Sequence, residues 1–191
     1  MLTSLRDHVL KFVKPSEKEL QLLLDAVETE VISHKQYLIK EGQYCLHLYF
    51  IVQGCFRSYF IHTSGAEKVI NFGIEDWWIT DFDSLVHNRP SELHIQAAED
   101  SIVLKISKQK LDLLLQESII INQYFRMIHE KVRIADQRRI KFMYSLSGEE
   151  LYHSFCEHNP KFVQRVPQYM LASYLGFTPE FLSKIRARKK K

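Results

Sequence analysis

The sequence contains few cysteines, and catalytic motifs are missing from it. Its 191 residues include three cysteines, Cys45, Cys55 and Cys156, and no pair has the C-x-x-C spacing of a metal site. We therefore expect reduced thiols that behave as small apolar residues. No P-loop, nucleophile elbow or H-x-x-x-H motif is present, and the neighbouring carboxylates Asp81 and Asp83 are typical of a solvated strand face. The sequence does not predict an enzyme.

Long apolar segments are also missing. No run approaches the roughly 20 apolar residues that are needed to cross a bilayer. The segment from Met1 to Lys14 is charged throughout, unlike a secretory signal peptide. We therefore predict a soluble, cytoplasmic protein with no membrane partner.

The charge is small in total but uneven along the chain. The net charge is +3, yet residues 161–191 hold eight Lys or Arg and one acid, whereas residues 1–160 hold 18 bases and 22 acids. A basic C-terminal segment behind a mildly acidic body suggests a polyanionic partner such as DNA or RNA. A solubilising basic tail is the alternative.

The hydrophobic pattern changes twice along the chain. Residues 1–27 indicate helices, with Ser16 and Glu19 spaced as a capping box. Residues 31–106 form short, β-rich runs separated by turn residues at intervals typical of an antiparallel barrel or sandwich. From Ser107 the pattern is helical again. We predict an α+β protein with a sensory β-barrel of jelly-roll type (1–117), a long helix (118–145) and a helical C-terminal domain (146–191).

The long helix is expected over about 119–144, because this stretch contains neither proline nor glycine. Apolar residues recur along it at alternating spacings of four and three, which is the spacing of a heptad seam between two helices. The predicted dimer seam consists of Ile121, Phe125, Ile128, Val132 and Ala135. A helix packed on its own barrel would show the same spacing and is the alternative.

The stretch 166–186 predicts a helix, a turn at Gly176 and a second helix. Thr178 suits the N-cap of the second helix and Pro179 its first position. If this is a helix-turn-helix, the second helix enters the major groove of DNA. Glu180 and Ser183 could then read base edges, while Lys184, Arg186, Arg188 and the three lysines 189–191 neutralise phosphates. An ordinary helical hairpin is the alternative.

Together these segments resemble the Crp/Fnr family of bacterial transcription regulators. The resemblance rests on LIKEG at 38–42, LYFIVQG at 48–54, FRSY at 56–59 and the helix-turn-helix at 166–186. It implies a cyclic-nucleotide-binding-type barrel, a homodimer joined by the long helix, and double-stranded DNA and RNA polymerase as partners. It also implies that the barrel could sense a small effector.

The resemblance departs from the family in the effector loop. Effector-binding members carry Gly-Glu where this sequence has Ile79-Thr80, and Arg followed by a small hydroxyl residue near Ser91-Glu92. Because a carboxylate at Glu92 would repel a phosphate, we expect that cyclic AMP is not the effector. The residues support no metal, iron–sulfur cluster or haem, so the cofactor stays unknown. The candidate pocket residues are Phe72, Trp77, Thr80, Arg89, Ser91, Glu92 and Tyr124.

Two further points stay open at this stage. The aromatic group of Phe72, Trp77 and Trp78 could stack on a planar ligand, fill the barrel or pack on the long helix. Tyr124 and Arg126 could couple a ligand to the DNA-binding helices. The sequence predicts a sequence-specific DNA-binding transcription regulator. The competing hypothesis is a small-molecule sensor that does not read DNA specifically.

Overall fold

A computed structural model describes residues 1–188 of the chain. Internal contacts divide the chain into two compact units. The first unit comprises residues 1–60 and 72–130, and the second comprises residues 61–71 with the chain from residue 131 onward. The three lysines 189–191, which the sequence assigns to phosphate neutralisation, lie outside the described residues.

Two short helices, α1 (Leu2–Leu10) and α2 (Glu17–Ala26), begin the first unit. The predicted capping box is present, because the Ser16 hydroxyl accepts from the backbone N–H of Glu19 and the Glu19 carboxylate accepts from the N–H of Ser16. Leu5, Val9, Leu20 and Leu23 are buried in the core of this unit. The apolar faces of both helices therefore contribute to the core.

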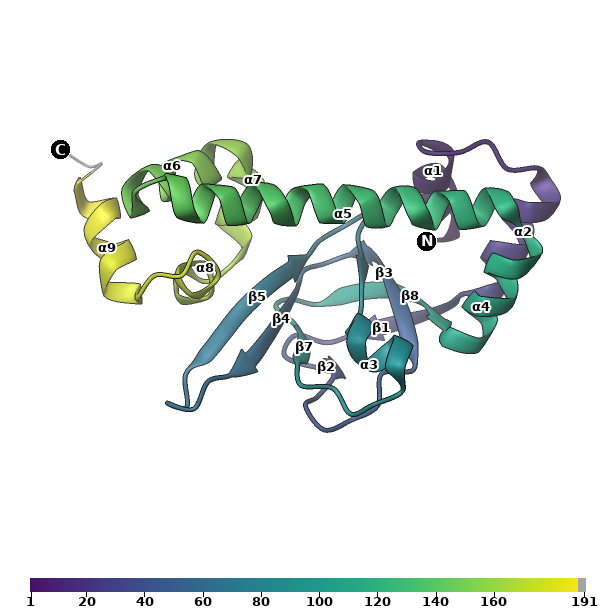
Figure 1. Cartoon of the computed structure of the whole chain (residues 1–191), viewed down its shortest axis with the longest axis horizontal. Helices are drawn as coiled ribbons and strands as arrows, with labels where there is room; N and C mark the ends of the chain where they lie inside the picture. Colours follow the sequence, from purple (N-terminus) through teal and green to yellow (C-terminus); the bar gives the residue numbers. More distant parts are fainter. Residues whose placement is uncertain (189–191) are drawn as a thin grey trace. The chain divides into compact units, whose positions relative to one another are not determined.

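The β-rich region forms two four-stranded sheets with the strand orders β1-β8-β3-β6 and β2-β7-β4-β5. This confirms the antiparallel fold class, with one refinement: the strands form two sheets rather than one closed barrel. Figure 1 shows the strands, whose bounds are β1 Glu28–Ile32, β2 Tyr37–Ile39, β3 His47–Gln53, β4 Phe56–Ile61, β5 Glu67–Gly73, β6 Trp78–Ile79, β7 His94–Ala97 and β8 Ser101–Ser107.

The helix α3 (Phe82–His87) lies between β6 and β7, where the sequence suggested a strand. Asp81 is its N-cap, and its carboxylate accepts from the backbone N–H groups of Asp83 and Ser84. The expectation that Asp81 and Asp83 mark a solvated strand face is therefore wrong, since Asp81 is a buried capping residue. An aspartate that bonds the backbone two and three residues ahead favours a helix start over a strand.

Two helices follow the sheets, α4 (Lys108–Glu117) and the long helix α5 (Ile119–Ser145). Ile121, Phe125 and Ile128 on α5 are buried in the core of the first unit, with Phe125 against Trp78 at 5.2 Å between ring centroids. These three residues therefore pack on their own unit, which is the alternative that the sequence left open, and the dimer seam stays a prediction. Val132 is half-buried and Ala135 is exposed. Helical spacing alone does not distinguish the two partners.

Four helices complete the second unit: α6 (Gly148–His158), α7 (Pro160–Arg165), α8 (Gln168–Tyr174) and α9 (Pro179–Arg188). Ser147 and Glu150 form a second capping box at the start of α6. Gly148 lies close to the Phe181 ring, so that α6 and α9 approach each other at a residue that has no side chain. Within residues 1–188, no helix combines the length and the apolar composition that crossing a membrane requires.

Candidate nucleic-acid interface and effector pocket

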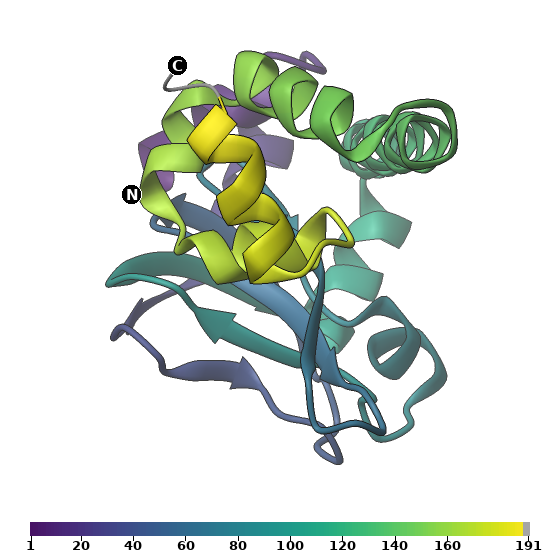
Figure 2. The ribbon, with the colours of Figure 1, turned by 90° about the vertical axis from the view of Figure 1, so that its left-hand side faces the viewer.

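The helices α8 and α9 form the predicted helix-turn-helix. Figure 2 shows them side by side, with α9 in yellow. Gly176 lies between them at φ +79°, a left-handed conformation that favours glycine. The hydroxyl of Thr178 accepts from the backbone N–H of Phe181 at 3.2 Å and so caps α9. The local signals in the sequence therefore correspond to the turn that the chain adopts.

The inner faces of the two helices pack closely. Leu171, Ala172 and Leu175 of the first helical segment and Leu182 and Ile185 of α9 are all buried. Ala172 is fully buried, so its methyl group occupies a place where a larger side chain would push α8 and α9 apart. This packing determines which face of α9 remains open to solvent.

The open face carries seven of the residues that the sequence assigned to DNA, all of them within residues 1–188. Every one of them is exposed: Thr178, Pro179, Glu180, Ser183, Lys184, Arg186 and Arg188. Arg188 also lies 3.4 Å from a carboxylate oxygen of Glu149 on α6. Hydrogen bonds from the N–H of Glu180 and from Thr178 lower the pKa of the Glu180 carboxyl, which therefore remains an acceptor at neutral pH. The face offers acceptors at its start and cations further along.

Residues of the candidate effector loop, around 79–92, form hydrogen bonds and an ion pair with one another. The hydroxyl of Ser91, which is buried, donates to the carboxylate of buried Asp81 at 2.6 Å. The Ser84 hydroxyl donates to the backbone carbonyl of Arg89 at 2.6 Å, and the Arg89 guanidinium forms an ion pair with Asp83. These contacts occupy the polar groups that a phosphate would need.

The other predicted pocket residues do not converge on one point. Arg89 and Glu92 are exposed, whereas Phe72 and Tyr124 are buried. The Thr80 hydroxyl donates to the carbonyl of His47 at 2.9 Å. The structure thus brings Ser91 to Asp81 rather than to the other candidates.

Aromatic side chains fill the inside of the first unit. Trp78 belongs to the core and lies 5.2 Å from Phe50 between ring centroids, so it fills the fold, and Trp77 packs against the same core. The Trp78 indole N–H donates to the Tyr124 hydroxyl at 2.8 Å, and this hydroxyl lies 2.8 Å from Nδ1 of His8. Because an indole can only donate, the Tyr124 hydroxyl accepts from Trp78, whereas the direction of its hydrogen bond with His8 depends on the tautomer of the imidazole.

Sequence reasoning missed His8 and Asp81. His8 lies on α1, 116 residues before its partner Tyr124, so no local pattern indicates their contact. Asp81 was detectable as an N-cap, because a short helical run follows it. Burial raises the pKa of Tyr124 above its usual value, and the tyrosine is therefore a neutral structural group. Arg126, the other coupling candidate, is exposed and pairs with Glu130.

The described residues also bear on metal binding. Between residues 1 and 188, no three His, Cys, Asp or Glu side chains lie close enough together to hold a metal ion. Cys45 and Cys55 are buried and Cys156 is half-buried.

Comparison with known proteins finds similarity to regulatory proteins. Residues 29–118 match the cyclic nucleotide-binding domain. An anaerobic regulatory protein of Pasteurella multocida is 26% identical over 191 residues, covering 92% of this chain and 68% of that protein. The regulatory protein HlyX of Actinobacillus pleuropneumoniae is 27% identical over 190 residues, covering 91% of this chain and 76% of HlyX.

A solved structure shows the same fold over most of the chain. The global regulator CLP of Xanthomonas campestris, described as responsive to c-di-GMP, superposes with a TM-score of 0.72. The match covers 92% of both chains at 12% sequence identity. The shared architecture therefore includes both the β-sheets and the C-terminal helices.

Proposed function

We propose that this chain, which is homologous to the Crp/Fnr transcription regulators and contains a cyclic nucleotide-binding domain, regulates transcription as a dimer that reads DNA with α9. The observation that carries the proposal is the helix-turn-helix itself. Its inner face is buried, its turn is closed by Gly176 and Thr178, and its outer face presents Ser183, Lys184 and Arg186 to solvent. This is the arrangement that places a second helix in the major groove.

Different residues on α9 have different roles in this proposal. Glu180 and Ser183 lie in the first turns of the helix, where they reach base edges, and a carboxylate there accepts from the amino group of cytosine. Lys184, Arg186 and Arg188 bind phosphates, which supplies affinity and salt dependence rather than sequence preference. RNA polymerase is the downstream partner that the family implies, and no enzymatic step is proposed.

The open part of α5 supports a dimer. Beyond Glu130 this helix exposes several apolar side chains, among them Ile134 at 49% and Phe142 at 40% exposure. Phe142 shares one face of the helix with Val132 and Ala135, and a second copy of the helix would cover this apolar face. We assign the dimer contact to this face of the second half of α5, because the first half is already buried in its own unit.

We propose that the β-sheets do not bind cyclic AMP. The Ser91–Asp81 hydrogen bond leaves a carboxylate at the loop where the family holds a phosphate, and Trp78, Tyr124 and Phe125 occupy the interior. A phosphate at that loop would meet like charge in a buried place. If the β-sheets bind an effector, we therefore propose that it does not place a cyclic phosphate at this loop.

The test of the function is the selection of binding sites from a random duplex library by the purified full chain, with and without cyclic AMP. We expect a two-fold-symmetric sequence with half-sites about 34 Å apart in both conditions. A sequence recovered only with cyclic AMP would overturn the effector proposal. No enriched sequence in either condition would favour the competing hypothesis of a sensor that does not read DNA.

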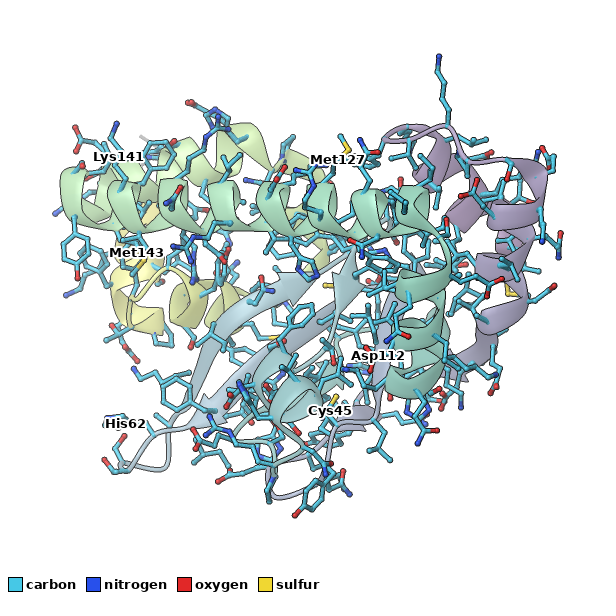
Figure 3. All side chains as sticks on the ribbon, turned by 45° about the vertical axis from the view of Figure 1, so that its right-hand side comes forward. Cys45, His62, Asp112, Met127, Lys141 and Met143 are labelled. Atoms are coloured by element: carbon cyan, nitrogen blue, oxygen red, sulfur yellow. The ribbon has the colours of Figure 1, made fainter. Side chains whose placement is uncertain are left out.

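A pair of matched double variants tests the assignment to α9. Lys184→Ala with Arg186→Ala should weaken operator binding tenfold or more and lower the salt slope by about 0.9 for each phosphate that is no longer neutralised. Lys14→Ala with Lys18→Ala, on exposed positions of the first unit, removes the same charge away from α9. Lys141 (Figure 3) is left unchanged, because it lies on the half of α5 that carries the proposed dimer contact. Equal weakening in both variants would mean that only total charge matters.

A further inference from the structure

The second unit contains a half-open groove that the proposed function does not use. Its volume is about 480 Å³, which is within the usual range of small-molecule sites. One wall is strand β5 and the other is a stretch of α5 that follows the first unit. Residues that line it include Ile70, Asn71, Arg133, Asp136, Gln137 and Ile140.

The groove combines opposite charges with amides on a small area. Arg133, Asp136, Gln137 and Ile140 are spaced by three and four residues and therefore share one face of α5. An arginine offers paired N–H donors to a carboxylate or phosphate, whereas an aspartate only accepts. The apolar side chain of Ile140 lies next to them. Such a wall suits a ligand with an anionic group, a donor group and some apolar surface.

Arg139 also lines the groove and has an unsatisfied donor. Its Nη1 donates to the carbonyl of Ile70 at 2.9 Å, and its guanidinium lies 4.9 Å from the centroid of the Tyr174 ring. Its Nε is buried and has no hydrogen-bond partner among residues 1–188. A buried N–H without an acceptor is costly, and a ligand oxygen admitted by a small shift of the side chain would satisfy it.

The wall formed by β5 is attached to the first helix of the helix-turn-helix. The Ser173 hydroxyl on α8 accepts from the N–H of Val69 at 2.9 Å and donates to the carbonyl of Glu67 at 3.0 Å. Burial raises the pKa of the neighbouring Tyr174, while Arg139 lowers it and Asp136 raises it, so both charges act on this α8 side chain. A ligand that changes the position of Arg139 therefore acts directly on α8.

We propose that this groove binds a small organic anion, with a phosphate or carboxylate held by Arg133 and Arg139 and a donor group held by Asp136, and that binding changes the DNA affinity of α9. The site is separate from the interior of the β-sheets, and all its residues belong to the second unit. The binding step stands by itself. Only the effect on DNA rests on the proposed function.

The binding step is tested by calorimetry on the full chain without DNA. The probes are guanosine monophosphate for the phosphate class, L-glutamate for the carboxylate class, and inorganic phosphate as a bare anion. We expect saturable binding of at least one organic probe at millimolar concentration or below, with inorganic phosphate much weaker. Arg133→Ala should weaken that binding roughly tenfold or more, because it removes one partner of a hydrogen-bonded charge pair.

Matched variants separate the groove from general charge. Arg138→Ala removes a neighbouring exposed arginine that does not line the groove and should leave binding unchanged. Asp136→Asn should lower the affinity for a probe that carries a donor group. It should leave the affinity for inorganic phosphate unchanged or raise it. Equal weakening by Arg133→Ala and Arg138→Ala would overturn the proposal, as would equal binding of inorganic phosphate and the organic probes, or no binding of any probe.

The coupling is tested last, by measuring operator affinity with the bound probe. We expect a change of threefold or more that Ser173→Ala reduces, because this variant detaches α8 from β5. Unchanged DNA affinity at saturating probe would overturn the coupling. If the chain selects no DNA sequence at all, the calorimetry still decides the binding step, so the two failures are distinguishable.

Discussion

The effector loop of the first unit and the outer face of α9 in the second unit are both rich in polar residues. Three of these residues are buried in the loop, whereas those on α9 are exposed. In the loop, Asp81, Ser84 and Ser91 are buried and bond one another or the backbone. On α9, Ser183, Lys184 and Arg186 are exposed. Polar residues that are already satisfied inside a fold stabilise it, whereas exposed ones on a rigid helix are available to a partner.

The largest effect is expected from shortening a side chain on the packed half of α5. Phe125→Ala should lower the free energy of unfolding by about 3–5 kcal/mol, since it removes a buried ring beside Trp78. Both tryptophans of the sequence, Trp77 and Trp78, lie in the first unit, so tryptophan fluorescence in urea reports on it. Phe142→Ala, on the open half, should leave this transition unchanged and weaken self-association in sedimentation experiments. The reverse result would favour a seam at Ile121, Phe125 and Ile128.

The next effect concerns the buried hydrogen bonds inside the first unit. Tyr124→Phe removes the hydroxyl that bonds the indole N–H of Trp78 and Nδ1 of His8, at a cost of about 1–3 kcal/mol. Tyr144→Phe makes the same chemical change on the same helix at a side chain that is 90% exposed, and should be neutral. Fluorescence-detected urea unfolding measures both. A neutral Tyr124→Phe would mean that the network adds nothing to stability.

A smaller effect is expected from replacing a glycine that has a left-handed backbone in each of the two units. Gly176→Ala and Gly42→Ala each put a side chain on a left-handed backbone, at φ +79° and +83°, and each should cost about 1–2 kcal/mol. Only Gly176→Ala should weaken operator binding, because Gly176 lies between α8 and α9. Circular dichroism follows unfolding and a gel-shift titration follows binding. Equal weakening of DNA binding by the two variants would contradict the assignment of α9.

The smallest effect is a difference in pH dependence. Burial lowers the pKa of His47 and His129 in the first unit from the ordinary 6.5. These histidines resist protonation when folded, so stability is complete above about pH 6.5 and is lost as pH falls through the lowered values. His129→Phe should reduce the decrease of the urea midpoint between about pH 7.5 and about pH 5.5. If His129→Phe left the decrease of the urea midpoint unchanged, other titrating groups would be responsible for that decrease.

In the second unit the corresponding decrease should begin at lower pH. Hydrogen bonds from the Ser147 hydroxyl and N–H lower the pKa of Glu150 from the ordinary 4.5. The folded state therefore binds this proton less readily than the unfolded state, and stability falls only as pH drops below about 4.5. Glu150→Ala should flatten that acid transition in circular dichroism. The same acid transition in Glu150→Ala and in the unchanged chain would contradict this assignment.

Sequence reasoning succeeded where the deciding contact is local. The Ser16–Glu19 capping box, the Gly176 turn and the Thr178 cap each depend on residues no more than a few positions apart. It could not decide whether Ile121, Phe125 and Ile128 cover their own unit or a second helix, because the spacing of an apolar helical face does not identify its partner. The proposed divisions at residues 117 and 145, and the roles of the α9 residues, remain predictions.

The sequence by itself determined the succession of a helical start, a β-rich region and a helical C-terminal part, together with the helix-turn-helix and its basic outer face, because spacing and turn chemistry act over a few residues. Only the tertiary structure decided that Tyr124 is hydrogen-bonded to His8 and that the Asp81 carboxylate accepts from the Ser91 hydroxyl. It also decided that β5 and α5 form a charged groove. These contacts join residues on different elements. Their formation depends on how the chain packs, which no local pattern encodes.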